Sequence, residues 1–113
     1  MKVYGIRILL KHKKKNKGNK RLGIEIDKLI SDLERYSPSE KSFFDIRKDA
    51  DLVHANGFYF FNIEIHRTLI LIVFEKKYEA TVLWVGSHDE YERTFRNNKS
   101  TIEKWLRNNN YFE

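Results

Sequence analysis

Two apolar runs in the second half of the chain constrain the fold more than any other feature. Leu69–Phe74 and Thr81–Val85 are rich in β-branched and aromatic residues, which favour strands. The polar segment 75–79 between them is short enough for a hairpin connection. A third run, Phe58–Ile65, follows the turn signal Asn56-Gly57. The sequence therefore predicts an antiparallel sheet built from consecutive strands.

The residues before this sheet predict a strand, two helices and a second short strand. Residues 2–10 mix polar and apolar side chains as a strand does. Between residues 22 and 33 the apolar residues recur at helical spacing. Residues 37–40, Ser-Pro-Ser-Glu, are typical of a helix start, and the short helix that follows would turn Phe43, Phe44 and Ile46 inward. Residues 52–54 complete this half as a short strand.

Capping residues predict two helices after the sheet. Ser87 with Glu90, and Ser100 with Glu103, each match the spacing of a capping box. The last helix is expected from Thr101 to about Asn108, before a run of asparagines. The expected fold is therefore a single α+β domain spanning residues 1–113, with an antiparallel sheet, two N-terminal helices on one side of it, and C-terminal helices.

Composition excludes several classes of protein. There is no cysteine, which rules out disulfides and thiolate chemistry. No apolar run approaches the roughly 20 residues of a membrane span, and residues 1–10 do not form the apolar core of a signal peptide. A cytoplasmic location without membrane association is expected. His54, His66 and His88 are too widely spaced for a recognisable metal motif, so neither a metal nor a cofactor is expected.

Positive charge is concentrated at the N-terminus. The first 21 residues hold nine Lys or Arg and no acid, whereas the rest of the chain holds 13 bases and 16 acids. A basic segment of this kind attracts polyanions, which favours nucleic acid or the ribosome as a partner. The alternative is a solvated lysine loop that serves solubility. The candidate RNA-binding residues are Lys11, Lys13, Lys14, Lys15, Lys17 and Lys20.

Two short motifs in the predicted sheet resemble a known family. The first is Phe61-Asn62-Ile63 within the expected strand Phe58–Ile65, and the second is residues 85–91, Val-Gly-Ser-His-Asp-Glu-Tyr, at the turn into a helix. Together with the order of elements, they resemble the HigB-type toxins of the RelE/ParE superfamily. The resemblance extends over about residues 43–95. It implies a RelE-like fold and the toxin of a type II toxin–antitoxin system.

The resemblance implies an endoribonuclease that cleaves messenger RNA, in the family on the translating ribosome, and that a cognate helix-turn-helix antitoxin neutralises. Metal-free cleavage needs a base for the ribose 2′-hydroxyl, cations for the phosphorane and an acid for the leaving 5′-oxygen. His88 and Tyr91 fall on the family's His and Tyr and are the candidates for proton transfer and substrate positioning. Glu90 matches the acidic residue beside the family's Tyr. Asn62 matches the Asn of the family's Phe-Asn-Ile segment, which is expected to be structural.

The chain departs from the family pattern between Ile63 and Leu69. Family members carry Gly-Gly-x-Lys-Tyr-Arg there, with the Arg as the candidate for phosphate contact. This chain is one residue shorter, so Thr68 takes the Arg position and Arg67 lies one place earlier. Because side chains alternate across a strand, Arg67 can contact phosphate only if the short turn restores its direction. His66 or an N-terminal lysine would otherwise take the role.

Three alternatives remain from the sequence. His88 and the acids around it also fit an ordinary exposed first helical turn, and Tyr91 also fits packing against the sheet. The chain could share the fold but bind a protein target such as DNA gyrase. It could also be a basic RNA-binding module without catalysis. The aromatic run 58–61 is expected to be core rather than a base-stacking platform.

Overall fold

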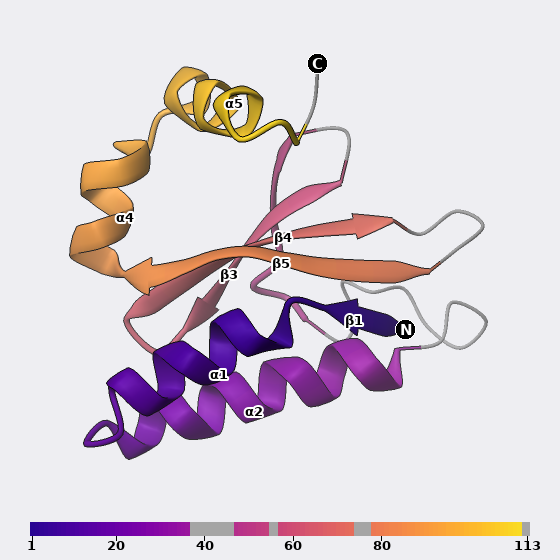
Figure 1. Cartoon of the computed structure of the whole chain (residues 1–113), viewed down its shortest axis with the longest axis vertical. Coiled ribbons are helices and arrows are strands. Elements are labelled where there is room, and N and C mark those ends of the chain that lie inside the picture. Colours follow the sequence, from indigo (N-terminus) through magenta and orange to yellow (C-terminus); the bar gives the residue numbers. More distant parts are fainter. Residues whose placement is uncertain (37–46, 55–56, 74–77, 112–113) are drawn as a thin grey trace.

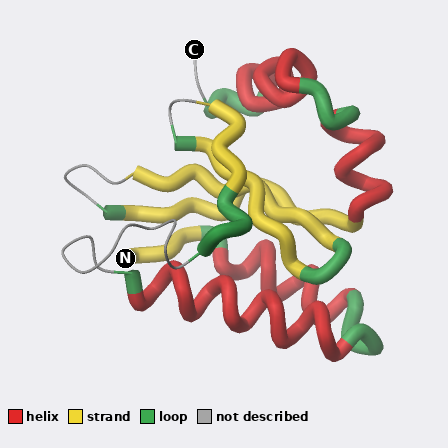
Figure 2. The backbone as a smooth tube through the Cα atoms, turned by 180° about the vertical axis from the view of Figure 1, so that it is seen from behind, coloured by secondary structure: helices red, strands yellow, loops and turns green. Residues whose placement is uncertain are grey.

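A five-stranded sheet lies between two pairs of helices in the computed structural model (Figures 1 and 2), which describes residues 1–36, 47–54, 57–73 and 78–111. The predicted α+β class is confirmed. The strands are β1 (Lys2–Tyr4), β2 (Asp51–His54), β3 (Phe58–Ile63), β4 (His66–Val73) and β5 (Glu79–Ser87). The described helices are α1 (Ile6–Lys15), α2 (Lys20–Arg35), α4 (His88–Phe95) and α5 (Lys99–Asn108).

The sheet is mixed, which corrects the expectation of a purely antiparallel one. Its order is β1-β5-β4-β3-β2, and β2 to β5 pair antiparallel with their sequence neighbours. The edge strand β1 instead runs parallel to β5, with Lys2 opposite Glu79. Short turns fix the direction of consecutive strands, but β1 pairs with a strand far away in the sequence. Only the tertiary arrangement sets that direction.

The predicted strand over residues 2–10 is wrong beyond Tyr4, because the chain turns there into α1. Gly5 makes this turn with a φ of 79°, a left-handed conformation that glycine adopts without strain. A Cβ at Gly5 would lie 2.8 Å from the carbonyl oxygen of Val82. In α1, Leu9 and His12 are buried three residues apart, which is helical spacing.

The predicted helix over residues 22–33 is confirmed as part of α2. The Asn19 side chain accepts a hydrogen bond from the backbone N–H of Leu22 and so caps its first turn. One face packs beneath the sheet beside α1 (Figure 2). Its buried residues are Leu22, Gly23, Ile26, Leu29 and Leu33. The helix expected after Ser37, with Phe43, Phe44 and Ile46, lies outside the described residues.

Alternation along β3 gives the sheet a core on each face. Tyr59 and Phe61 pack with α1 and α2, whereas Phe58 and Phe60 pack with α4 and α5. All four aromatic side chains are buried, as predicted for core residues. Burying a Phe stabilises the fold by roughly 1.5–3 kcal/mol. The run 58–61 therefore anchors both helical layers to one strand.

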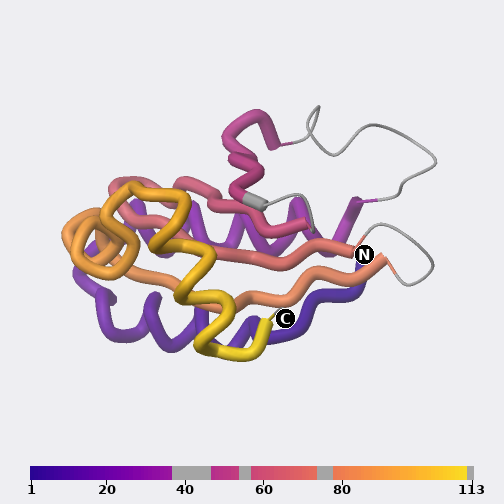
Figure 3. Tube along the Cα trace, turned by 90° about the horizontal axis from the view of Figure 1, so that it is seen from above, coloured from indigo at the N-terminus to yellow at the C-terminus, as the bar shows by residue number. Residues whose placement is uncertain are grey.

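The strands and helices of the C-terminal half match the predictions with two exceptions, the first being that the strand expected over Phe58–Ile65 ends at Ile63. The expected capping box of Ser87 and Glu90 is present at the start of α4. The box of Ser100 and Glu103 is not the cap of α5, because that helix begins earlier. The side chain of Asn98 accepts the N–H of Thr101 and caps α5 instead. Figure 3 shows α4 at one end of the sheet, with α5 crossing the strands. No helix of the described residues has the length and apolar character needed to cross a membrane.

Candidate functional site

A hollow of about 450 Å³ lies where β5 passes into α4, beside the turn that joins β3 to β4. Three of the four candidate catalytic residues line it, namely His66, Arg67 and His88. The other residues that line the hollow are Asn62, Glu64, Ile65, Ser87 and Asp89. The fold thus brings the two matched motifs, 61–63 and 85–91, to one end of the sheet.

The short turn before β4 directs Arg67 to the side of the sheet that α4 and α5 cover. Leu69, two residues on, packs in the core on that side, so Arg67 shares its face. The guanidinium carbon of Arg67 lies 4.4 Å from the centre of the Tyr91 ring. Thr68, at the family's Arg position, faces the opposite side and is completely buried. Its hydroxyl donates to the carbonyl oxygen of Trp84 at 2.7 Å.

The geometry of this turn explains the direction of Arg67. Ile63 pairs with His66, so only Glu64 and Ile65 connect the two strands. Glu64 has a left-handed φ of 64°, which a two-residue hairpin turn requires at its first position. Its carboxylate accepts a hydrogen bond from the Asn19 amide at 2.6 Å. The contact with α2 therefore helps to hold a conformation that is unfavourable for glutamate.

Tyr91 lies against Arg67 and has its hydroxyl in a hydrogen bond. Its side chain is buried, and its hydroxyl donates to Asn97 Oδ1 at 3.0 Å. Burial raises the pKa of Tyr91 above its usual value, while the charge of Arg67 acts to lower it. A cation over an aromatic face gains about 0.5–2 kcal/mol depending on exposure. Tyr91 can thus hold the guanidinium at the edge of the hollow.

His88 is the first residue of α4 and its side chain is 59% exposed. Its Nε2 atom lies 3.6 Å from Glu92 Oε1, and its ring stacks beside that of Tyr91 with centres 6.2 Å apart. Glu90, in contrast, accepts the backbone N–H of Ser87. That hydrogen bond lowers the pKa of Glu90 and makes it a structural carboxylate. His88 is the more accessible of these two groups for proton exchange.

His66 faces away from Arg67, toward α1, and meets a residue that the sequence did not single out. His12 Nε2 and His66 Nδ1 are 2.9 Å apart, and both side chains are buried. Burial is the main cause that lowers the pKa of His12, followed by the charge of His66. The spacing of His12 from Leu9 on one helical face was the available signal. This spacing was not recognised because the lysine-rich segment around His12 gave no indication of a helix.

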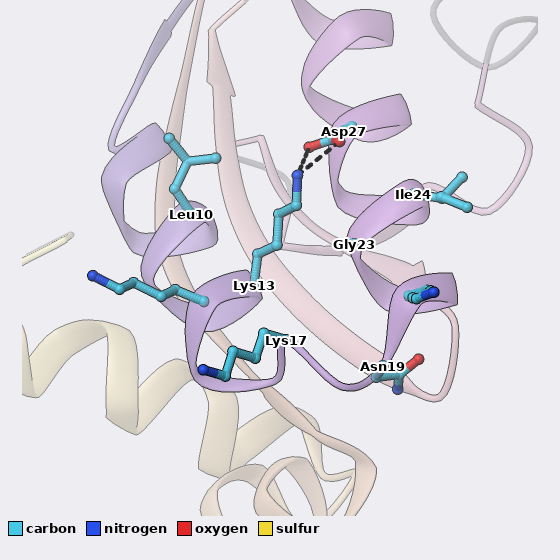
Figure 4. A pocket seen from close by; sticks show the side chains of 9 residues that line it. Leu10, Lys13, Lys17, Asn19, Gly23, Ile24 and Asp27 are labelled. Atoms are coloured by element: carbon cyan, nitrogen blue, oxygen red, sulfur yellow. Dashed lines mark hydrogen bonds and ion pairs between the residues drawn. The ribbon is translucent and has the colours of Figure 1, made fainter.

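The N-terminal lysines divide into two groups on α1 and the start of α2. Lys11 and Lys15 are four residues apart and, with His12, line a hollow of about 250 Å³. Lys15 is near enough to Glu90 for its charge to lower that carboxyl's pKa. Lys13, Lys14, Lys17 and Lys20 instead line a groove between α1 and α2 (Figure 4). The single basic patch expected from the sequence is therefore two separate surfaces.

No family model matches this chain, and neither the curated proteins nor the solved structures include a match to it. The described residues also contain no group of three or more His, Cys, Asp or Glu side chains placed to hold a metal ion.

Proposed function

We propose that this chain is a metal-free endoribonuclease with the fold and role of a HigB-type toxin, acting on messenger RNA at the ribosome. The observation that carries the proposal is the placement of Arg67. Its guanidinium is held on Tyr91 and lines the same hollow as His88. A fixed cation and an accessible imidazole in one hollow supply two of the three functions that phosphodiester cleavage by a ribose 2′-hydroxyl requires, the base and the cation.

In the proposed reaction the 2′-oxygen attacks the adjacent phosphorus and the bond to the 5′-oxygen breaks. Neutral His88 takes the proton from the 2′-hydroxyl, and Arg67 balances the charge on the phosphorane. His66 is buried with its Nδ1 against His12, so the leaving 5′-oxygen takes its proton from water, and the His88 imidazolium returns a proton to that water. The products are a 2′,3′-cyclic phosphate and a 5′-hydroxyl. Tyr91 positions Arg67 and takes no proton.

Lys11 and Lys15 are assigned to the RNA strand next to this hollow. They lie on the face of α1 that carries His12, which contacts His66. Lysines near a phosphate chain increase affinity by releasing counterions, without reading sequence. The proposed partner proteins are the ribosome and a cognate helix-turn-helix antitoxin.

The proposal is tested by incubating the purified protein with ribosomes, a defined message and excess EDTA, and mapping the ends of the fragments. We expect fragments with cyclic phosphates, reduced about 10²–10³-fold by Arg67→Ala, the loss typical of a removed transition-state contact. His88→Ala should reduce cleavage strongly as well, whereas Arg93→Ala, at an exposed arginine on α4, serves as the matched control and should leave it unchanged.

Two results would overturn the proposal. RNA binding without cleavage would assign the chain to the non-catalytic RNA-binding modules. Growth arrest on expression without RNA cleavage would favour a toxin that binds a protein target such as DNA gyrase.

A further inference from the structure

The groove between α1 and α2 has an apolar surface with a basic rim. Its volume is about 410 Å³, and Figure 4 draws the side chains that line it. Leu10 on α1 and Ile24 on α2 form its walls and are 46% and 66% exposed. These two aliphatic side chains in one groove offer a partner an apolar surface to cover.

The floor of the groove depends on Gly23 and Lys13. A Cβ at Gly23 would lie 3.2 Å from Lys13 Cε, so the missing side chain leaves space for the lysine stem. The Lys13 ammonium reaches across to Asp27, with Nζ 2.8 Å from Oδ2 (Figure 4). The lysine thus covers Gly23 with methylene groups, and its charge is neutralised.

The rim carries uncompensated positive charge. Lys14, Lys17 and Lys20 line the groove and form no ion pair within the described part of the chain. Asp27 is the only acid among the described residues that line the groove, and it already pairs with Lys13. A partner that covers the aliphatic walls would therefore bring its own negative charges to the rim.

We propose that this groove binds an acidic amphipathic helix of a partner protein. The lining residues run from Leu10 on α1, through the turn between the helices, to Asp27 on α2, and they cover about two turns of α2 or roughly 12 Å. A helix of similar length can place apolar residues at i, i+3 or i+4, and i+7 between Leu10 and Ile24. Glu or Asp at its flanking positions would then meet the three lysines. RNA lacks the aliphatic surface that these walls require.

The inference is independent of RNA cleavage, because the groove shares no lining residue with the hollow beside α4. It also divides the basic segment by role. Lys11 and Lys15 serve the proposed RNA path, and Lys14, Lys17 and Lys20 serve the protein partner.

The test is a selection from a phage-displayed helical scaffold. One helix carries fixed leucines at the anchor positions, and its flanking positions vary among Glu, Gln and Lys. We expect selection on the full chain to enrich Glu. Leu10→Ser with Ile24→Ser should weaken binding of a selected helix at least tenfold, and so should Lys14→Gln, Lys17→Gln and Lys20→Gln together.

The control is Leu52→Ser with Val73→Ser, which alters two other exposed aliphatic residues, on β2 and β4, and should leave binding unchanged. Thermal melting should show that every variant folds. No enrichment, enrichment without preference for acids, or binding unaffected by the serine pair would overturn the proposal. A dimer of this chain lost in the serine pair would assign the groove to a second copy. A 12-nucleotide RNA that depends on the three rim lysines would assign it to RNA.

Discussion

His12 and His66 join α1 to β4 through a buried contact of 2.9 Å between Nε2 and Nδ1. One proton satisfies this pair, because one ring nitrogen donates while the other accepts. A second proton between these two nitrogens would set two N–H groups against each other and leave one ring positively charged in a poorly solvated position. The main charged groups near His12 are Glu90, which favours its protonation, and Lys15, which opposes it.

This pair should make folding stability depend on pH. The folded-state pKa of His12 lies below its ordinary value of 6.5, so the unfolded chain binds more protons as the pH falls through that value. The contribution of His12 to the free energy of unfolding is therefore fully present above about pH 6.5 and declines below it. Urea unfolding between pH 8 and pH 5 should show this decline, and His12→Gln should flatten it. His88→Gln, at an exposed position, is the control. If it flattened the pH dependence of stability equally, the buried His12–His66 pair would not be the cause of that dependence.

Substitutions at Tyr91 test whether this residue positions Arg67 or transfers a proton. Tyr91→Phe keeps the ring beneath Arg67 and removes only the hydroxyl that contacts Asn97. It should lower the free energy of unfolding by about 1 kcal/mol while RNA cleavage persists with an unchanged pH profile. Tyr91→Leu should reduce cleavage much more at a similar fold content. Complete inactivity of the Phe variant would instead give the hydroxyl a catalytic role.

Substitutions at Thr68 test whether the position that carries Arg in the family faces the core in this chain. Thr68→Val removes the hydrogen bond to Trp84 O and should cost about 1 kcal/mol. Thr68→Arg would bury an unpaired charge at a fully buried position and should prevent stable folding. Chemical denaturation measures both, with Thr81→Val on β5 as the control. A stable, active Thr68→Arg protein would show that Arg67 does not replace the family residue.

Gly5 should be sensitive to the smallest substitution. Gly5→Ala requires a left-handed backbone, which costs roughly 1–2 kcal/mol for a residue with a Cβ. The Cβ would also lie 2.8 Å from Val82 O, so the total should exceed that range. Gly18→Ala is the matched control because no atom lies within 4 Å of its Cβ position. Equal melting temperatures for the two variants would contradict the geometry of the β1–α1 turn.

The sequence predicts local structure well where local interactions decide it. Helical spacing in residues 22–33, strand-forming runs and the Ser87–Glu90 cap all depend on neighbours within a few residues, and each is present. Residues 2–10 mislead because their apolar pattern fits a strand and a helix alike. The strand ends at the left-handed turn of Gly5, which packs so closely against Val82 of β5, a segment distant in sequence, that a Cβ there would lie 2.8 Å from Val82 O.

The sequence by itself determined which side chains are available for chemistry. They are a histidine and an arginine at the start of β4, and a histidine at the start of α4. Only the tertiary structure decided which of them face one another. The two-residue turn sends Arg67 to Tyr91 and His66 to His12. Because adjacent residues on a strand point to opposite faces of the sheet, a shift of one residue in register would exchange these two directions. The same holds for the lysines, which the helical twist of α1 divides between two surfaces.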